Sequence, residues 1–365
     1  GDVTGSLIVI EEVLDSDAEN VDAWRLKGDI LMSQQELEEA LAAFEQVITL
    51  SGEDYGARVN TALIKLQLQD YEAAQADASE LLREAPQSPH ANYVQGLLHF
   101  QRGSYEEAVS ALSLAEPLGE QYPLVFFYLG SAHLQQGNLD QATVFARSFV
   151  DLAPGNVNGR KLLGALYLRQ GQDEEARDVI KPVLDSNPDD LGALNVMANA
   201  LLREGRTDEG FELLARIAEL QPDSPVAQMR LGASLMLSGR EDEASQRLET
   251  ALDIDPEFQQ ADILLILNHL QKEDYQGAID AAKAYRRRNI GKVAPSLPLG
   301  RTYLAPRRHE EARDALDSAL KLEPGTPSAH LSQAQLALVE DDREAARGHY
   351  QAILADHPDH LTTLL

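Results

Sequence analysis

Apolar residues fall at helical spacing along this chain, in pairs of short stripes separated by turn residues. In residues 157–190, one stripe is centred on Tyr167 and a second on Ile180. Gly171 lies between the two stripes, where it lets the chain turn. The second stripe ends before Pro188, because the residue preceding a proline disfavours the helical conformation. The pattern predicts two helices joined by a tight turn.

The same pair of stripes returns at a fixed interval of 34 positions. One position of the first stripe is small in every copy except at Ile266: Gly28, Ala62, Gly96, Gly130, Gly164, Ala198, Gly232, Gly300 and Ala334. A second series of small residues, from Ala40 to Ala346, follows 12 positions later. A larger side chain at these positions would push one helix off the other, so they indicate close packing. A fixed period in this range predicts a stacked array of repeats.

Counted from Val21, ten repeats follow one another without an insertion. Their expected bounds are 21–54, 55–88, 89–122, 123–156, 157–190, 191–224, 225–258, 259–292, 293–326 and 327–360. Residues 1–20 are expected to hold the second helix of a truncated preceding repeat, and residues 361–365 the start of a following helix. Both ends look cut, so we interpret the sequence as part of a larger protein.

The repeats resemble the tetratricopeptide repeat (TPR), a family that has the same period. Residues 21–54 carry Trp24, Gly28, Ala40 and Phe44 at signature positions of that family. The resemblance implies an all-α fold, a right-handed α-α superhelix (TPR solenoid) of about ten helix-turn-helix repeats plus partial repeats at both ends. Arrays of this kind mostly bind other molecules, so we expect no enzyme activity.

Two stretches depart from the pattern. Pro298 falls inside the expected first helix of repeat nine, so that helix should start late or be kinked, and Pro306 should close it early. Arg286, Arg287, Arg288 and Lys292 form a basic cluster in an acidic chain. It is either a solvated helix end that complements the helix dipole or a contact for an acidic partner. Residues 116–119 predict a rearranged turn that keeps the register.

The composition limits the classes of molecule that this protein can bind. The chain has a formal net charge of -29 and a pI of about 4.6, so its surface repels nucleic acid and anionic lipid. The negative charge either keeps the protein soluble or attracts basic partners. There is no cysteine, which excludes disulfides and thiol chemistry. There is no apolar run of about 18 residues, so we expect no membrane span, although a lipid anchor outside this sequence is compatible with it.

No motif for catalysis, cofactor binding or metal binding is present, so catalytic residues, cofactors and metal ligands are all expected to be absent. His99, His133 and His269 occupy one equivalent position in three repeats, where Tyr167 stands in another. They are therefore interpreted as packed side chains and not as metal ligands. His357 and His360 offer a weak metal pair at the C-terminal end.

In the TPR family, the first helix of each repeat lines a concave groove. The resemblance therefore implies a partner-binding surface, made of an aromatic patch followed by a polar strip: His90, Tyr93, Phe100, Phe127, Gln135, Lys161, Arg169, Asn195, Asn199 and Arg203. Its expected partners are other proteins or extended peptides, with polysaccharide as a further candidate. The alternative for each apolar residue is packing between neighbouring helices. The carboxylate clamp of chaperone-binding TPRs is not reproduced, because Ala165 follows Lys161 where asparagine is required.

A narrower resemblance rests on residues 255–270, 125–130 and 162–168. These stretches are similar to the TPR-repeat lipoprotein family PrsT of the bacterial PEP-CTERM/exosortase system. That resemblance implies an interaction scaffold in exopolysaccharide assembly or protein sorting. Its place would be the periplasm or outer membrane of a Gram-negative bacterium, with the cytoplasm as the alternative. Two other functions stay open: the regulatory or targeting region of a larger enzyme such as a glycosyltransferase, and direct glycan binding.

Overall fold

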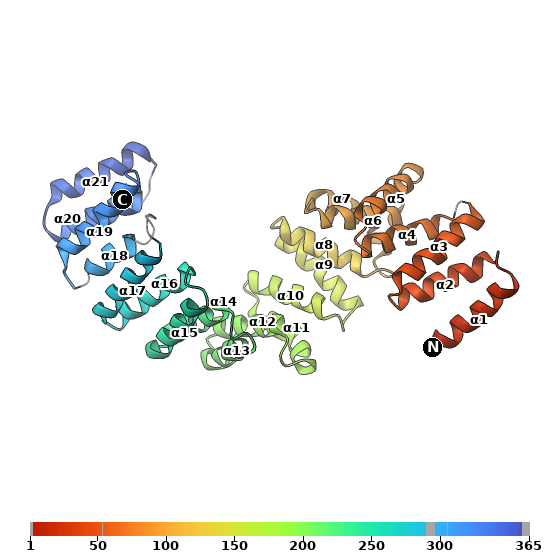
Figure 1. The fold of residues 1–365 in the computed structure, drawn as a ribbon, viewed down its shortest axis with the longest axis horizontal. Coiled ribbons are helices and arrows are strands. Elements are labelled where there is room, and N and C mark those ends of the chain that lie inside the picture. Colours follow the sequence, from red (N-terminus) through yellow and green to blue (C-terminus); the bar gives the residue numbers. More distant parts are fainter. Residues whose placement is uncertain (1–2, 53, 290–295, 305, 360–365) are drawn as a thin grey trace. The chain divides into compact units, whose positions relative to one another are not determined.

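The computed structural model describes residues 3–52, 54–289, 296–304 and 306–359, and this part of the chain is all-α (Figure 1). The chain divides into two compact bodies, Gly1–Asn187 and Pro188–Leu365. We call them the N-terminal and the C-terminal body and describe each by itself. None of the described helices is long and apolar enough to cross a membrane.

The N-terminal body is built from antiparallel helix pairs in which neighbours along the chain pack together. Its helices are α1 (Val3–Ser16), α2 (Val21–Ser33), α3 (Leu37–Ser51), α4 (Tyr55–Gln67), α5 (Tyr71–Glu84), α6 (Pro89–Gln101), α7 (Tyr105–Ala115), the short 3₁₀ helix η1 (Glu116–Leu118), α8 (Leu124–Gln135), α9 (Leu139–Leu152), α10 (Val157–Arg169) and α11 (Asp173–Ser186).

The C-terminal body continues the same alternation of helices. Its helices are α12 (Leu191–Arg203), α13 (Thr207–Leu220), α14 (Pro225–Leu237), α15 (Glu241–Ile254), α16 (Gln259–Gln271), α17 (Tyr275–Arg288), α18 (Ser296–Leu304), α19 (His309–Leu322), α20 (Pro327–Val339) and α21 (Arg343–Asp356). The even-numbered helices from α2 onward are the first helices of the repeats, and the odd-numbered ones from α3 onward are the second helices.

The second helices, from Leu37 to Arg343, begin at the constant interval that the sequence predicts. The turn before each of them contains one residue with positive φ, and these residues recur with the same period. Five of them are glycines, such as Gly171 with a φ of 74°. The other five carry side chains, such as Glu273 with a φ of 58°, a conformation that disfavours L-residues. The turn geometry is thus kept even where glycine is missing.

Small residues on the first helices make room for large residues on the second. A Cβ added to Gly96 would lie 2.6 Å from Cγ of Leu112, and one added to Gly232 would lie 2.9 Å from Cγ of Leu248. Both leucines are fully buried. Because real Cβ atoms do not approach so closely, these glycines set the distance between the two helices of a repeat.

Ile266, which breaks the small-residue series, is accommodated by an exchange of sizes. It is buried in the same apolar cluster as Ala282, which lies on the second helix of the same repeat. In most other repeats the position equivalent to Ala282 holds a large residue, as Leu112 does opposite Gly96, although Ala78 and Ala146 occupy it in two of them. The isoleucine therefore fills the space from the first helix that a leucine elsewhere fills from the second.

The two irregular stretches differ in outcome. Helix α7 ends at Ala115 and is followed by η1, yet α9 begins at Leu139, one full period after the start of α7 at Tyr105. The prediction of a rearranged turn without loss of register is confirmed. The described part of helix α18 runs from Ser296 to Leu304 and contains Pro298. The part of the prediction that concerns residues 293–295 lies outside the described residues.

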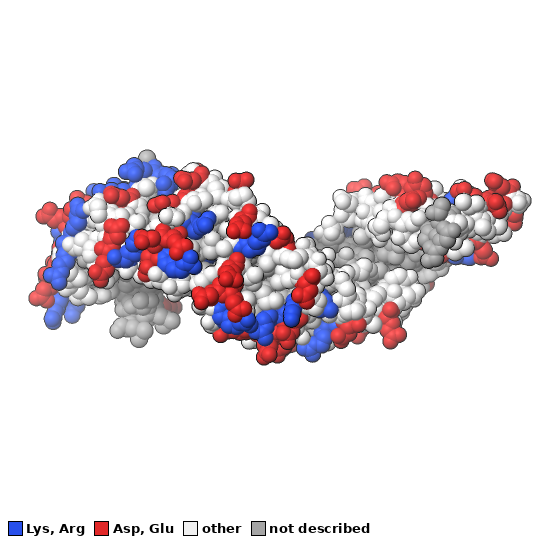
Figure 2. Space-filling view, turned by 90° about the horizontal axis from the view of Figure 1, so that it is seen from below, with Lys and Arg blue, Asp and Glu red and all other residues white. Residues whose placement is uncertain are grey.

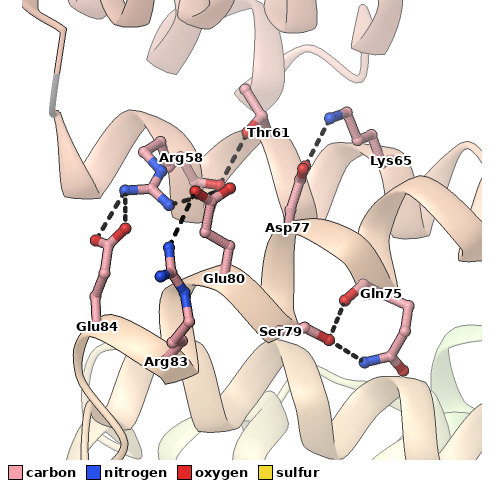
Figure 3. A network of polar contacts seen from close by, with 9 residues as sticks. All are labelled: Arg58, Thr61, Lys65, Gln75, Asp77, Ser79, Glu80, Arg83 and Glu84. Carbon is pink, nitrogen blue, oxygen red and sulfur yellow. Dashed lines mark hydrogen bonds and ion pairs between the residues drawn. The ribbon is translucent and has the colours of Figure 1, made fainter.

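Charged residues cross-link helices on the surface. Between α4 and α5, the Arg58 guanidinium donates to the Glu84 carboxylate at 2.8 Å, and the Lys65 ammonium lies 2.6 Å from the Asp77 carboxylate (Figure 3). Acidic and basic side chains also lie next to one another at many points on the face shown in Figure 2. The two pairs of Figure 3 are partly buried, and because ion pairs at the protein surface are worth only about 0–1 kcal/mol each, the apolar contacts between helices dominate stability.

Candidate functional site

The aromatic residues of the predicted groove lie in the N-terminal body and pack among themselves. Tyr93 on α6 is only 6% exposed, and its ring centroid lies 6.0 Å from that of Tyr122. Burial raises the pKa of its hydroxyl above the ordinary value. His90 is half-buried and packs edge-on against the same tyrosine, with centroids 5.9 Å apart. These contacts match the packing alternative, and partner binding by Tyr93 stays a prediction.

Phe100 and Phe127 are half-buried and also belong to aromatic contacts within this body. The ring of Phe100 lies 5.1 Å from that of Tyr128 on the next first helix, and the ring of Phe127 lies 5.3 Å from that of the buried Phe149. Each ring therefore keeps part of its surface accessible while it stabilises a helix contact. Their role in binding a partner or a glycan stays a prediction.

The polar residues of the predicted groove are divided between the bodies. Gln135 and Arg169 are exposed and lie at the ends of α8 and α10, and Lys161 on α10 is half-buried. Asn195 and Asn199 lie on α12 in the C-terminal body and are half-buried, and Arg203 lies exposed at the end of that helix. The sequence did not indicate that Asn195 and Asn199 belong to a different compact body from Gln135, Lys161 and Arg169.

The two asparagines are held by an arginine that the sequence analysis did not single out. The Arg230 guanidinium on α14 donates to the side-chain oxygen of Asn195 and, at 3.3 Å, to that of Asn199. Each asparagine amide also donates to a backbone carbonyl one turn earlier, as Asn199 does to Asn195 at 2.8 Å. The asparagines thus connect two first helices, and their use as a peptide clamp stays a prediction.

One arginine of the predicted basic cluster has a structural partner. The Arg288 guanidinium pairs with the carboxylate of Asp262, whose side chain is 2% exposed. Burial raises the pKa of this carboxyl group, and the arginine partly offsets the rise. Arg286 and Arg287 are exposed in the last turn of α17, where positive charge complements the helix dipole. Lys292 lies outside the described residues.

The histidines are placed on helix surfaces and between helices. The His133 ring stacks on that of Phe145 at 5.5 Å, and His269 lies 2.8 Å from the carboxylate of Asp274. Burial lowers the pKa of His99 and of His133. Among the described residues, no group of three or more histidine or acidic side chains could hold a metal ion. His360, one of the suggested metal pair, lies outside that part of the chain.

The C-terminal body contains an apolar pocket that the sequence analysis did not identify. It has a volume of about 430 Å³ and lies between the first helices α16, α18 and α20. Six of its lining residues share one property: they occupy the family's groove positions in repeats eight to ten. These residues are Ile263, Leu267, Leu270, Leu297, Arg301 and Ser328. A sequence signal for them was available, because Ile263 and Leu270 hold the same positions in repeat eight as the predicted groove residues Tyr93 and Phe100 hold in repeat three.

Sequence comparison assigns the family. Two sequence models, both described as tetratricopeptide repeat, match this chain: one over residues 1–55, 59–123 and 297–360, the other over residues 133–200 and 201–265. The chain is a tetratricopeptide repeat protein. No curated protein matches the sequence of this TPR protein.

Solved structures with similar folds include several TPR proteins of different origin. YrrB, described as a TPR protein with an unusual peptide-binding site, shares 18% identity, with a TM-score of 0.44, over 50% of this chain and 95% of its own. A TPR protein from Parabacteroides merdae shares 13% identity, with a TM-score of 0.48, over 65% of this chain and 94% of its own. PilF of Pseudomonas aeruginosa shares 22% identity, with a TM-score of 0.41, over 57% of this chain and 94% of its own.

Proposed function

We propose that this TPR protein is a protein-binding scaffold whose C-terminal body takes up a partner segment on its first-helix face. The observation that carries the proposal is the apolar pocket between α16, α18 and α20. Its volume of about 430 Å³ falls within the range of ligand-binding pockets. Ile263 and Leu267 are 42% and 48% exposed there, which leaves apolar surface available to a partner.

We propose further that the partner belongs to exopolysaccharide assembly or PEP-CTERM protein sorting at the envelope of a Gram-negative bacterium. The support is the resemblance of residues 255–270 to the PrsT family. The place of action would be the periplasm or the outer membrane. Stacked helix pairs and a strongly acidic surface suit an extended binding platform better than an active site.

Site-directed photo-crosslinking tests the proposal. A photoreactive residue replaces Leu267 on α16 or, as a control, the 55% exposed Val144 on the second helix α9. Each protein is incubated with the solubilised envelope of a Gram-negative bacterium whose genome encodes an exosortase. We expect an envelope protein to crosslink to position 267 and not to position 144. Equal crosslinking at both positions, or recovery of cytosolic chaperones alone, would contradict the proposal.

A further inference from the structure

The charge of the pocket is opposite to that of the protein. The chain has 60 acidic and 31 basic residues, yet no acidic residue lines the pocket between α16, α18 and α20, as far as its walls are described. Its walls are aliphatic except for Arg301, two hydroxyl residues and a proline. A cation in an apolar wall favours a ligand that combines an apolar group with a negative charge.

One hydrogen bond orients the Arg301 side chain, and the remaining N–H groups of its guanidinium are available to a ligand. Its Nε donates to the hydroxyl of Ser332 at 3.0 Å, and that hydroxyl, on a residue 1% exposed, donates to the backbone carbonyl of Ser328 at 2.8 Å. Arg301 has no ion-pair partner among the described residues. Its two terminal nitrogens therefore remain available as a fork, the arrangement that binds a carboxylate through two parallel hydrogen bonds.

A second charged pocket in the same body shows the contrast. It has a volume of about 540 Å³, and beside apolar residues it is lined by the acidic Asp208, Glu212 and Glu243 and the basic Arg240 and Arg247. There the Arg240 Nε donates to the Glu243 carboxylate at 2.8 Å, and acidic side chains in the same wall offset the positive charge. Arg301 has no such neighbour in the described part of the chain, and its charge is available to a partner.

Exposed apolar side chains lie on both helices that flank α18. Ile263 and Leu267, in the pocket wall on α16, are 42% and 48% exposed, and Leu338 and Val339, at the C-terminal end of α20, are 50% and 57% exposed. Because apolar side chains are accessible on the helices to either side of Arg301, a bound chain need not end there. This favours the carboxylate of an internal side chain over that of a chain terminus.

We infer that the pocket binds an internal peptide segment in which an aliphatic side chain stands near an aspartate or glutamate. The aliphatic group fills the pocket between α16 and α18, and the acidic group pairs with Arg301. The inference rests on the proposed function, because it names the partner chemistry of the same surface. It predicts that peptide selection by this protein follows both hydrophobicity and negative charge.

Selection from a random dodecapeptide library, displayed with no free C-terminus, tests this inference. The baits are the intact chain and four variants. Leu267→Asp removes the apolar contact, and Leu237→Asp introduces the same charge at a residue that is 90% exposed on α14, outside the pocket. Arg301→Gln removes the fork, and Arg83→Gln makes the same change in net charge at a residue whose side chain is 76% exposed on α5, in the N-terminal body. Circular dichroism confirms that each variant is folded.

We expect the intact chain to select aliphatic peptides enriched in aspartate and glutamate. Arg301→Gln should lower their affinity about tenfold and remove the acidic enrichment, since hydrogen bonds to charged groups are the stronger ones. Leu267→Asp should abolish selection, while both control variants should behave as the intact chain does.

Three outcomes would contradict the reasoning in different ways. If no peptide is selected, or if Leu267→Asp selects as well as the intact chain, the proposed function fails. If aliphatic peptides are selected with no acidic preference, or with equal affinity for Arg301→Gln, only the charge inference fails. If selection succeeds solely from a second library with free C-termini, the ligand is a terminal carboxylate, and the internal-segment inference fails.

Discussion

Replacement of Gly96 by alanine should reveal how tightly the two helices of one repeat are packed. The new methyl group would lie 2.6 Å from Cγ and 2.8 Å from Cδ2 of Leu112, a fully buried side chain on the partner helix. Overpacking of a dense core costs about 1–3 kcal/mol. The same change also gains about 1 kcal/mol of helix propensity, because glycine is the poorer helix former.

A matched control separates the two effects. Gly348 lies inside helix α21, and a methyl group added there would meet no atom within 4 Å. Gly348→Ala should therefore stabilise the protein by up to about 1 kcal/mol. The difference between the two substitutions isolates the clash, which we expect to cost about 1–3 kcal/mol.

The assay is urea unfolding of the full chain, followed by circular dichroism at 222 nm, with comparison of midpoints and slopes. Leu112→Ala removes the two side-chain atoms that the new methyl group would meet and leaves the backbone nitrogen of residue 112 at 3.2 Å. In that background the clash with the side chain is gone, so Gly96→Ala should be less unfavourable than in the unaltered chain by about 1–3 kcal/mol. If Gly96→Ala stabilises the unaltered chain as much as Gly348→Ala does, the packing argument is refuted.

Three further predictions use the same unfolding assay. Arg288→Ala should cost about 1–3 kcal/mol by leaving the buried Asp262 carboxyl group without its partner, while Arg287→Ala should cost little; equal losses would refute the pair. Glu273→Gly should stabilise by about 0.5 kcal/mol, because its positive φ of 58° suits glycine, and a loss would count against this. Burial, together with a neighbouring histidine charge, lowers the pKa of His349, so the unfolded chain binds its proton more readily. Stability should fall as the pH drops below about 6.5, and His349→Asn should reduce that fall; an unchanged profile would contradict it.

Local signals account for the part of the fold that could be predicted from the sequence. Residues such as Gly96, Gly171 and Pro188 act within one repeat, so the helix pairs could be predicted from spacing alone. The exchange of sizes between Ile266 and Ala282 could not, because the compensating residue lies on another helix. In the sequence, Ile266 interrupts the series of small residues, whereas in the structure it is buried and well packed.

The candidate site was predicted less completely, for two physical reasons. Side chains at groove positions also pack against the next repeat, as Phe100 does against Tyr128, and sequence position does not separate these roles. Aromatic side chains are the more usual anchors of a binding surface, whereas the pocket beside Arg301 is aliphatic. Its arginine could be distinguished only once the structure showed that it has no ion-pair partner among the described residues.

Hydrogen–deuterium exchange tests the central claim, that a partner binds the first-helix face of the C-terminal body. The chain is measured with and without the tightest-binding peptide from the library selection. The account predicts that α16, α18 and α20 gain protection upon peptide binding, and that Leu267→Asp abolishes the gain. Protection confined to second helices such as α15 and α17, or to helices of the N-terminal body, would contradict it.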